Sequence, residues 1–170
     1  MNIRQARTGD EACITDVHIQ SWQKAYQGTL PDDLLNNLSY EKRFEQWKQA
    51  IANSSDGYGL FVAENDNGDI VGFASCGKSR SLEKFPEYAG ELYAIYLLPT
   101  EVRKGIGRQL SDRVVTHLKR HSMNSMIIWV LQDNDACLFY KDLGGRFIGS
   151  DRLRIGDEYY TEIAYGWKEI

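Results

Sequence analysis

The 170-residue sequence has no apolar run that approaches the ~18 residues of a membrane-spanning helix. Its first residues, Met1 to Arg4, contain no apolar stretch of the signal-peptide type. Its three cysteines, Cys13, Cys76 and Cys137, lie far apart and form no C-x-x-C pair. These absences predict neither a disulfide framework nor a zinc site, and they favour a reduced, cytoplasmic setting without a membrane partner.

Positive charge is not in excess either. The chain has 24 acidic and 20 basic residues, a net charge of −4, which argues against a nucleic acid as the main partner. His18, His117 and His121 are scattered, so no metal site is predicted. The length favours a single domain over residues 1–170.

Hydrophobic periodicity divides the chain into alternating strands and helices. A β-meander follows the first strand and helices, and the remainder reads β-α-β-α-β-β. This order predicts an α+β fold with a largely antiparallel sheet and one right-handed crossover. The predicted strands are 3–6, 58–64, 70–76, 88–98, 126–131, 146–155 and 158–167; the predicted helices are 12–26, a short helix from Pro31, 39–51, 106–118 and 134–143, with a break at 54–57.

One glycine-containing loop, Val102 to Arg108, lies between a predicted strand and a predicted helix. Gly105 and Gly107 lack Cβ atoms, and the free N–H groups of the helix start form a site for an anion such as a diphosphate. The loop also contains Arg103, Lys104, Ile106 and Arg108, three of them cationic. A structural alternative is that the glycines only allow close helix–strand packing. A dinucleotide fingerprint does not fit, because Leu110 occupies its last glycine position.

About 30 residues further on, the sequence runs from Asn134 through Ala136 and Tyr140 to Gly144-Gly145. Together with the glycine loop, this segment resembles the GNAT superfamily of acyl-CoA-dependent N-acetyltransferases, over nearly the whole chain. Val102 departs from the family's usual Gln or Arg, but backbone N–H groups would make most of the phosphate contacts. The segment from Ser21-Trp22 to Leu34 resembles a bacterial subgroup in which some members acetylate polyamines.

The resemblance implies a mixed sheet of about seven strands, flanked by helices and splayed at the cofactor site. It also implies acetyl-CoA as the acyl donor, with direct transfer to an amine in a ternary complex. By the same resemblance Tyr140 is the acid that faces the CoA sulfur, and Asn134 helps to hold the pantetheine arm. Leu97 and Leu98 are expected to offer backbone groups to that arm, and residues 102–108 to bind the diphosphate.

The resemblance also makes Glu91 the predicted base, because its distance ahead of Val102 matches that of the catalytic glutamate in histone-acetylating members of the family. Strand alternation is expected to place it on one face with Tyr93, Ile95 and Leu97. A carboxylate in the cleft could take the amine proton directly or through water. An exposed glutamate at a strand start is the alternative, and Tyr93 could then belong to a water chain.

The acceptor side is predicted from Trp22, Tyr26 and Tyr93, although helical spacing equally fits Trp22 and Tyr26 as core residues. The sequence therefore predicts an N-acetyltransferase for a small primary amine, with polyamines as one acceptor class. Peptide or protein N-acetylation and a non-catalytic acyl-CoA sensor are the alternatives. Aromatic residues of the last hairpin and the family habit favour a homodimer.

Overall fold

The computed structural model describes residues 1–52 and 57–170, so most of the predicted break at 54–57 lies outside the described residues. The observed elements follow the predicted order closely. The strands are β1 (Asn2–Gln5), β2 (Gly59–Glu64), β3 (Ile70–Lys78), β4 (Gly90–Leu97), β5 (Met126–Leu131), β6 (Arg146–Ile155) and β7 (Glu158–Trp167). The helices are α1 (Glu11–Ala25), α2 (Asp32–Asn36), α3 (Tyr40–Ala52), α4 (Ile106–Arg120) and α5 (Ala136–Asp142), with a 3-10 turn η1 (Pro99–Glu101).

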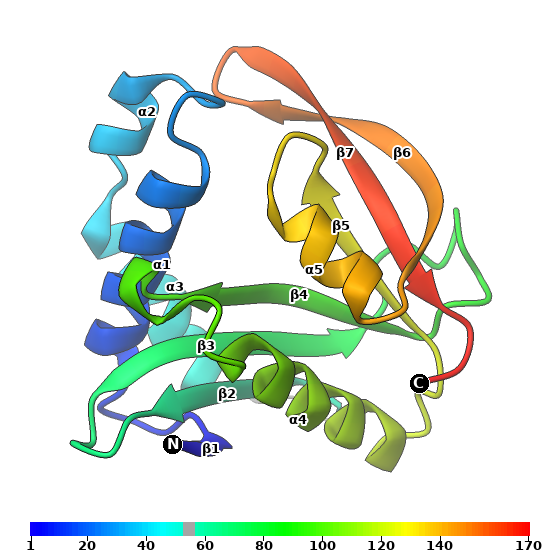
Figure 1. The fold of residues 1–170 in the computed structure, drawn as a ribbon, viewed down its shortest axis with the longest axis horizontal. Helices are drawn as coiled ribbons and strands as arrows, with labels where there is room; N and C mark the ends of the chain where they lie inside the picture. Colours follow the sequence, from blue (N-terminus) through cyan, green and yellow to red (C-terminus); the bar gives the residue numbers. More distant parts are fainter. Residues whose placement is uncertain (53–56) are drawn as a thin grey trace.

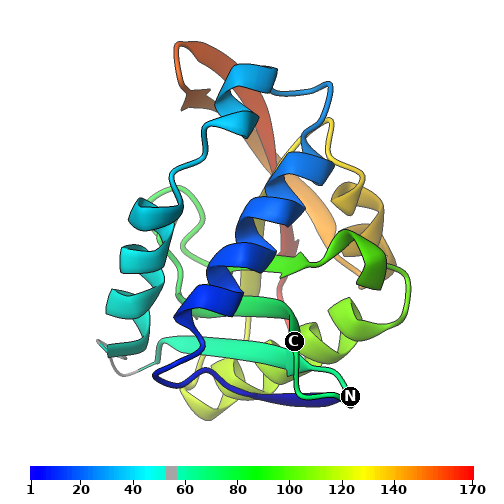
Figure 2. The same ribbon diagram turned by 90° about the vertical axis from the view of Figure 1, so that its left-hand side faces the viewer.

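The strands form one seven-stranded sheet in the order β1-β2-β3-β4-β5-β7-β6. Every neighbouring pair is antiparallel except β4 and β5, which are parallel and connected through α4. Helices α1 and α3 cover one face of the sheet, and α4 and α5 cover the other (Figures 1 and 2). The predicted α+β class, with a mixed and mostly antiparallel seven-stranded sheet, is confirmed.

The core on the α4 face is built from an apolar stripe of the helix predicted at 106–118. Ile106, Leu110, Val114 and Leu118 are at most 1% exposed and belong to one cluster with side chains of β2, β3 and β5. The spacing of these residues turns one side of α4 onto the sheet. Cys76 and Cys137 are buried in the same cluster.

On the opposite face, α1 and α3 pack over the other side of the same strands. Ile14 and Val17 of α1 and Trp47 of α3 form a buried cluster with residues of β2 and β3. Because both faces are covered, β2 and β3 are buried almost along their whole lengths. No helix among the described residues is long and apolar enough to span a bilayer.

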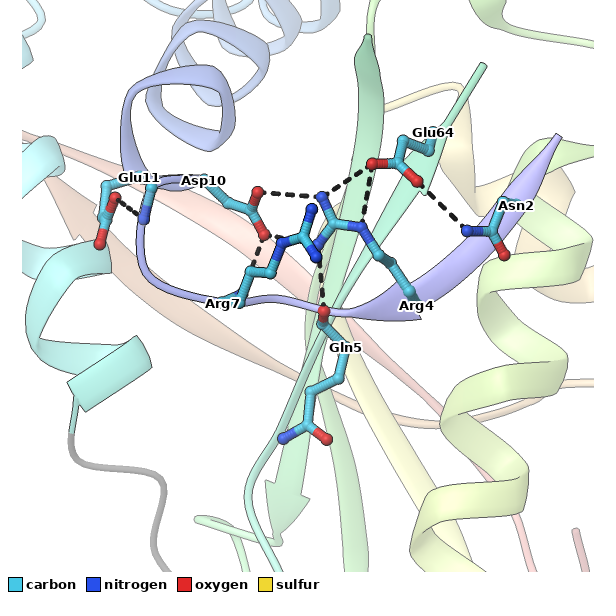
Figure 3. A network of polar contacts seen from close by, with 8 residues as sticks. Asn2, Arg4, Gln5, Arg7, Asp10, Glu11 and Glu64 are labelled. Atoms are coloured by element: carbon cyan, nitrogen blue, oxygen red, sulfur yellow. Dashed lines mark hydrogen bonds and ion pairs between the residues drawn. The ribbon is translucent and has the colours of Figure 1, made fainter. Parts of the chain in front are cut away.

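A charged network fixes β1 to the start of α1 (Figure 3). The Arg4 guanidinium donates to both carboxylate oxygens of Asp10, at 2.7 and 3.0 Å, and to Glu64 of β2 at 2.9 and 3.0 Å. Asp10 also accepts the Arg7 N–H at 2.9 Å. Asp10 precedes α1 but makes no capping hydrogen bond to the helix, because its carboxylate is used by Arg4 and Arg7. The sheet edge and α1 are thereby joined in one arrangement.

Candidate active site

The sheet opens between its two parallel strands. β4 and β5 are paired only at Gly90–Met126 and Glu91–Ile127, and beyond these pairs they diverge (Figure 1). β4 remains paired with β3 on its other side. The splayed strands expected from the sequence are therefore present, and they leave a gap in the ladder near the middle of the sheet.

Several backbone groups at the end of β4 already form hydrogen bonds within the protein. The Leu97 carbonyl accepts the Ser21 hydroxyl at 2.5 Å, and the Leu98 N–H donates to the Val71 carbonyl at 2.8 Å. The Leu98 carbonyl accepts the Glu101 N–H at 2.8 Å. The two carbonyls each retain a second lone pair that could accept from the pantetheine arm, whereas the Leu98 N–H is already used. The predicted pantetheine contacts of Leu97 and Leu98 remain a prediction.

The glycine loop lies between the end of β4 and α4. Arg103 and Gly105 have left-handed φ values of 63° and 79°, and the helix begins at Ile106 without a side-chain cap. A left-handed residue followed by helical residues turns successive N–H groups toward one point, which is the geometry of an anion nest. An added Cβ on Gly105 would meet no atom within 4 Å, whereas one on Gly107 would lie 3.2 Å from the Phe139 ring. Gly105 therefore faces open space, and Gly107 is the glycine that permits close packing.

The charges around this loop point outward. Arg103 and Arg108 are exposed, and Lys104 pairs with Glu101 at 3.0 Å. Val102 is 49% exposed and contributes an apolar side chain to this loop. The loop combines uncapped N–H groups with an accessible cationic rim, which suits a diphosphate.

Tyr140 lies on α5, buried beside the sheet opening. The residue is 4% exposed, and its ring centroid lies 6.2 Å from that of Tyr165 on β7. Burial, together with the nearby phenols of Tyr96 and Tyr26, raises the Tyr140 pKa well above its usual value. An ordinary tyrosine already carries its proton at neutral pH, so Tyr140 holds the proton that an acid needs, and the raised pKa makes it a weaker acid.

Trp22 and Tyr26 come from the end of α1 to the same place. The Trp22 indole N–H donates to the Tyr96 hydroxyl at 2.9 Å, and Tyr26 interacts with Tyr96 and with Asn134. The Asn134 side-chain oxygen accepts the Ala136 N–H at 2.8 Å at the start of α5. The structure therefore brings the predicted Trp22, Tyr26, Asn134 and Tyr140 together, with Tyr26 buried as the core alternative also required.

Glu91 and Tyr93 are not part of this tyrosine group. The Glu91 carboxylate is 1% exposed and accepts the Arg80 backbone N–H at 2.7 Å. It also accepts the guanidinium of Arg80 at 2.5 and 3.1 Å. Tyr93 donates to the Lys78 carbonyl at 2.6 Å and lies under the Arg80 guanidinium. The alternative of an exposed strand-start glutamate is wrong, and the role of Glu91 as the base stays a prediction.

The predicted alternation along β4 is also wrong, because the strand contains a β-bulge. Cys76 pairs with Leu92 but Ser75 pairs with Ala94, so β4 has one extra residue at Tyr93. Beyond the bulge Ile95 and Leu97 pack on the α4 face, whereas Ala94 and Tyr96 pack on the α1 face. Glu91 and Tyr93 therefore do not share a face with Ile95 and Leu97.

Sequence reasoning missed three polar residues around the opening. The bulge explains Tyr96, which strict alternation places on the wrong face. Arg80 lies in the irregular segment between β3 and β4, where no pattern indicates a role. Glu162 lies on β7 and is near Arg80 and Glu91 only through the folded sheet.

Comparisons with known proteins agree with this geometry. Residues 19–145 match the model of the acetyltransferase (GNAT) family. The chain is 35% identical over all its 170 residues to the uncharacterized N-acetyltransferase YuaI of Bacillus subtilis, covering 94% of that protein. It is 31% identical to the L-methionine sulfoximine/L-methionine sulfone acetyltransferase of Salmonella typhimurium, over 81% of this chain and 75% of that one.

A solved structure also shares the fold. PaiA N-acetyltransferase of Thermoplasma acidophilum, in complex with coenzyme A, superposes with a TM-score of 0.72 at 20% identity, covering 95% of this chain and 96% of the other. The chain belongs to the acetyltransferase (GNAT) family.

Proposed function

We propose that this protein transfers the acetyl group of acetyl-CoA to the primary amine of a small molecule, by direct attack in a ternary complex. The observation that carries the proposal is the opening between β4 and β5, which has the uncapped start of α4 at one end and Tyr140 beside it. An extended cosubstrate with a diphosphate and a thioester suits such a slot.

Acetyl-CoA would supply an activated carbonyl and a leaving thiolate. The N–H groups of residues 104–108 would bind its diphosphate, and Asn134 would contact the pantetheine arm. Each hydrogen bond to a charged oxygen would contribute roughly 1.5–3 kcal/mol. Tyr140 would donate its proton to the departing sulfur, since a phenol carries its proton at neutral pH.

The acceptor is proposed to be of amino-acid size. The Salmonella relative is named for two derivatives of methionine, and Trp22, Tyr26 and Tyr96 narrow the α1 side of the opening with large rings. Polyamines, which the resemblance in the α1 region suggests, form the second acceptor class to be compared.

An acceptor panel tests the function. Release of the CoA thiol is measured with L-methionine sulfone, standard L-amino acids, putrescine, spermidine and a lysine-containing peptide at fixed acetyl-CoA. We expect turnover with one of the small amines and less than a tenth of that rate with the peptide. Tight coenzyme A binding without turnover on any amine would identify an acyl-CoA sensor instead.

A further inference from the structure

Glu162 occupies a position on β7 that faces the acceptor side of the opening. It pairs with Leu131 of β5 and with Asp151 of β6. Residues directly opposite in an antiparallel ladder share a face, and Leu131 packs with Trp22 and Tyr26. Tyr160, two residues earlier on β7, packs in that same cluster. Glu162 therefore lies on the α1 face of the sheet, across the opening from β4.

The charged groups around Glu162 come from three elements. Asp151 is on β6, Glu91 is on β4, and Arg80 and Lys84 are on the segment between β3 and β4. Lys84 is paired with Asp151 at 2.9 Å, and Arg80 is paired with Glu91. The residues contributed by β5 and α1, Leu131, Trp22 and Tyr26, are uncharged at neutral pH.

The carboxylates of Glu91 and Glu162 both lie near the opening, but they differ in burial and in hydrogen bonding. Glu91 is fully buried, and both its oxygens are hydrogen-bonded to Arg80. Glu162 is only half-buried, and among residues 1–52 and 57–170 its carboxylate has neither an ion pair nor a hydrogen bond. A carboxylate held by an arginine must break that pair before it can take a proton, whereas Glu162 is free to accept one.

We propose that the Glu162 carboxylate receives the acceptor's amine, binding its ammonium form and then taking the proton that the amine loses before it attacks the thioester. This inference rests on the proposed function. In this proposal Glu162 replaces Glu91 as the base, and Glu91 holds the Arg80 guanidinium in place.

The proton and electron balance is simple. The ammonium gives one proton to Glu162, and the freed lone pair forms the N–C bond to the acetyl carbon. The C–S electron pair leaves on sulfur, which takes the Tyr140 proton. The new amide nitrogen then loses its second proton, which restores Tyr140 through solvent, and Glu162 releases its own to water. The net products are the acetylated amine, the CoA thiol and one proton.

The surroundings of Glu162 suit a base. Burial, and then the negative charges of Asp151 and Glu91, raise the Glu162 pKa above its ordinary value, while Lys84 and Arg80 oppose the shift. A base closer in pKa to neutrality is stronger while still ionised at neutral pH. The reaction rate should therefore fall as the pH falls through the Glu162 pKa.

The test compares E162Q with E158Q, using whichever of L-methionine sulfone or spermidine the wild-type enzyme acetylates faster. Glu158 is an exposed carboxylate on the same strand that accepts the Tyr160 hydroxyl at 2.8 Å, so it is a matched control. We expect E162Q to lose about 100-fold or more in kcat and to lose the acid limb of the kcat–pH profile. E158Q should retain both, and KM for acetyl-CoA should stay within about two-fold in either variant, since Glu162 is assigned to the acceptor alone.

Two neighbouring substitutions should move the acid limb in opposite directions. D151N removes a negative charge beside Glu162 and should shift the limb to lower pH. K84M removes a positive charge and should shift it to higher pH. A structural role for Glu162 would produce neither shift.

E162A serves if E162Q folds poorly, because added formate can enter the space and replace the missing carboxylate. Recovery of kcat by formate in E162A, but not in the wild-type protein, supports the assignment. An E162Q enzyme that folds and keeps its kcat and its acid limb overturns the assignment and leaves the proposed function intact. A wild-type protein that acetylates no amine in the panel overturns both.

Discussion

Tyr140 is the residue whose chemistry depends most directly on its surroundings. Burial and the nearby phenols of Tyr96 and Tyr26 raise the pKa of its hydroxyl, which is protonated at neutral pH with or without this shift. Y140F should lower kcat by about 100-fold, because an enzyme without the acid must expel an unprotonated thiolate. KM for acetyl-CoA should change little. Steady-state kinetics of thiol release measure both.

The matched control for this variant is Y165F. Tyr165 is buried beside Tyr140 in the same cluster but lies on β7. If Y165F loses as much kcat as Y140F, the loss reflects packing, and Tyr140 has no special role as an acid.

Arg80 should matter for stability as well as for the site. Within the described part of the chain, R80M leaves the buried Glu91 carboxylate with one hydrogen-bond partner, the backbone N–H of position 80. Hydrogen bonds to charged groups contribute roughly 1.5–3 kcal/mol, and the exposed Arg80 side chain places this pair at the lower end, so we expect a loss of about 2 kcal/mol. Urea unfolding measures it.

The double variant R80M/E91Q separates the pair from its surroundings. Replacing the carboxylate by an amide removes the unpaired buried charge, so the double variant should be more stable than R80M alone. A double variant no more stable than R80M alone would mean that the unpaired Glu91 charge is not what destabilises R80M.

At the scale of elements, the two glycines before and within α4 do different things. Gly105 needs its left-handed φ and faces open space, whereas Gly107 touches Phe139 of α5. G105A should raise KM for acetyl-CoA by about 10-fold, since the positive φ of this position is strained for alanine and the nest would be distorted. G107A should mainly lower stability, because the Phe139 ring must move by a few tenths of an ångström. Comparing KM with the unfolding midpoint distinguishes the two, and equal effects would contradict this division.

Some of these elements could be predicted from the sequence, and others could not. The apolar stripe of α4, the glycine loop and the strand order are local or nearly local patterns, and each is found where periodicity placed it. The faces along β4 could not be predicted, because one extra residue at Tyr93 reverses the alternation and leaves no mark in the sequence. Glu162 and Arg80 are 82 positions apart in the chain, so only the assembled sheet brings them together.

At the scale of the whole molecule, the opening is held by its two covering layers. α4 binds β2 and β3 from one side through its own cluster, and α1 binds them from the other. Tyr26 joins the two sides of the gap, because it interacts with both Tyr96 and Asn134. The packing of α1 against the sheet therefore determines how rigid the acceptor side of the opening is.

His18 lies at the centre of that layer and couples it to pH. It stacks on Tyr96 with ring centroids 5.1 Å apart, and its Nδ1 accepts the Trp47 indole N–H at 3.1 Å. Burial, and then the charge of Arg43, lowers the His18 pKa to about 3. The folded protein therefore holds His18 neutral at pH values where the unfolded chain protonates it.

The sign of the effect follows from proton uptake. Below its unfolded pKa of about 6.5, His18 binds a proton only when the chain unfolds, so stability is lost as the pH falls from about 6.5 towards 3. At pH 5.5 this loss amounts to about 1.4 kcal/mol for one group. His117, whose pKa is also lowered by burial, acts in the same sense and remains in any His18 variant.

The free energy of unfolding in urea, measured at pH 7.5 and 5.5 in the wild-type protein and in H18Q, isolates the contribution of His18. The glutamine oxygen can still accept from Trp47, so H18Q should fold. The loss of unfolding free energy between pH 7.5 and 5.5 should be smaller in H18Q by about 1.4 kcal/mol. An unchanged loss would show that His18 is protonated in the folded protein as well.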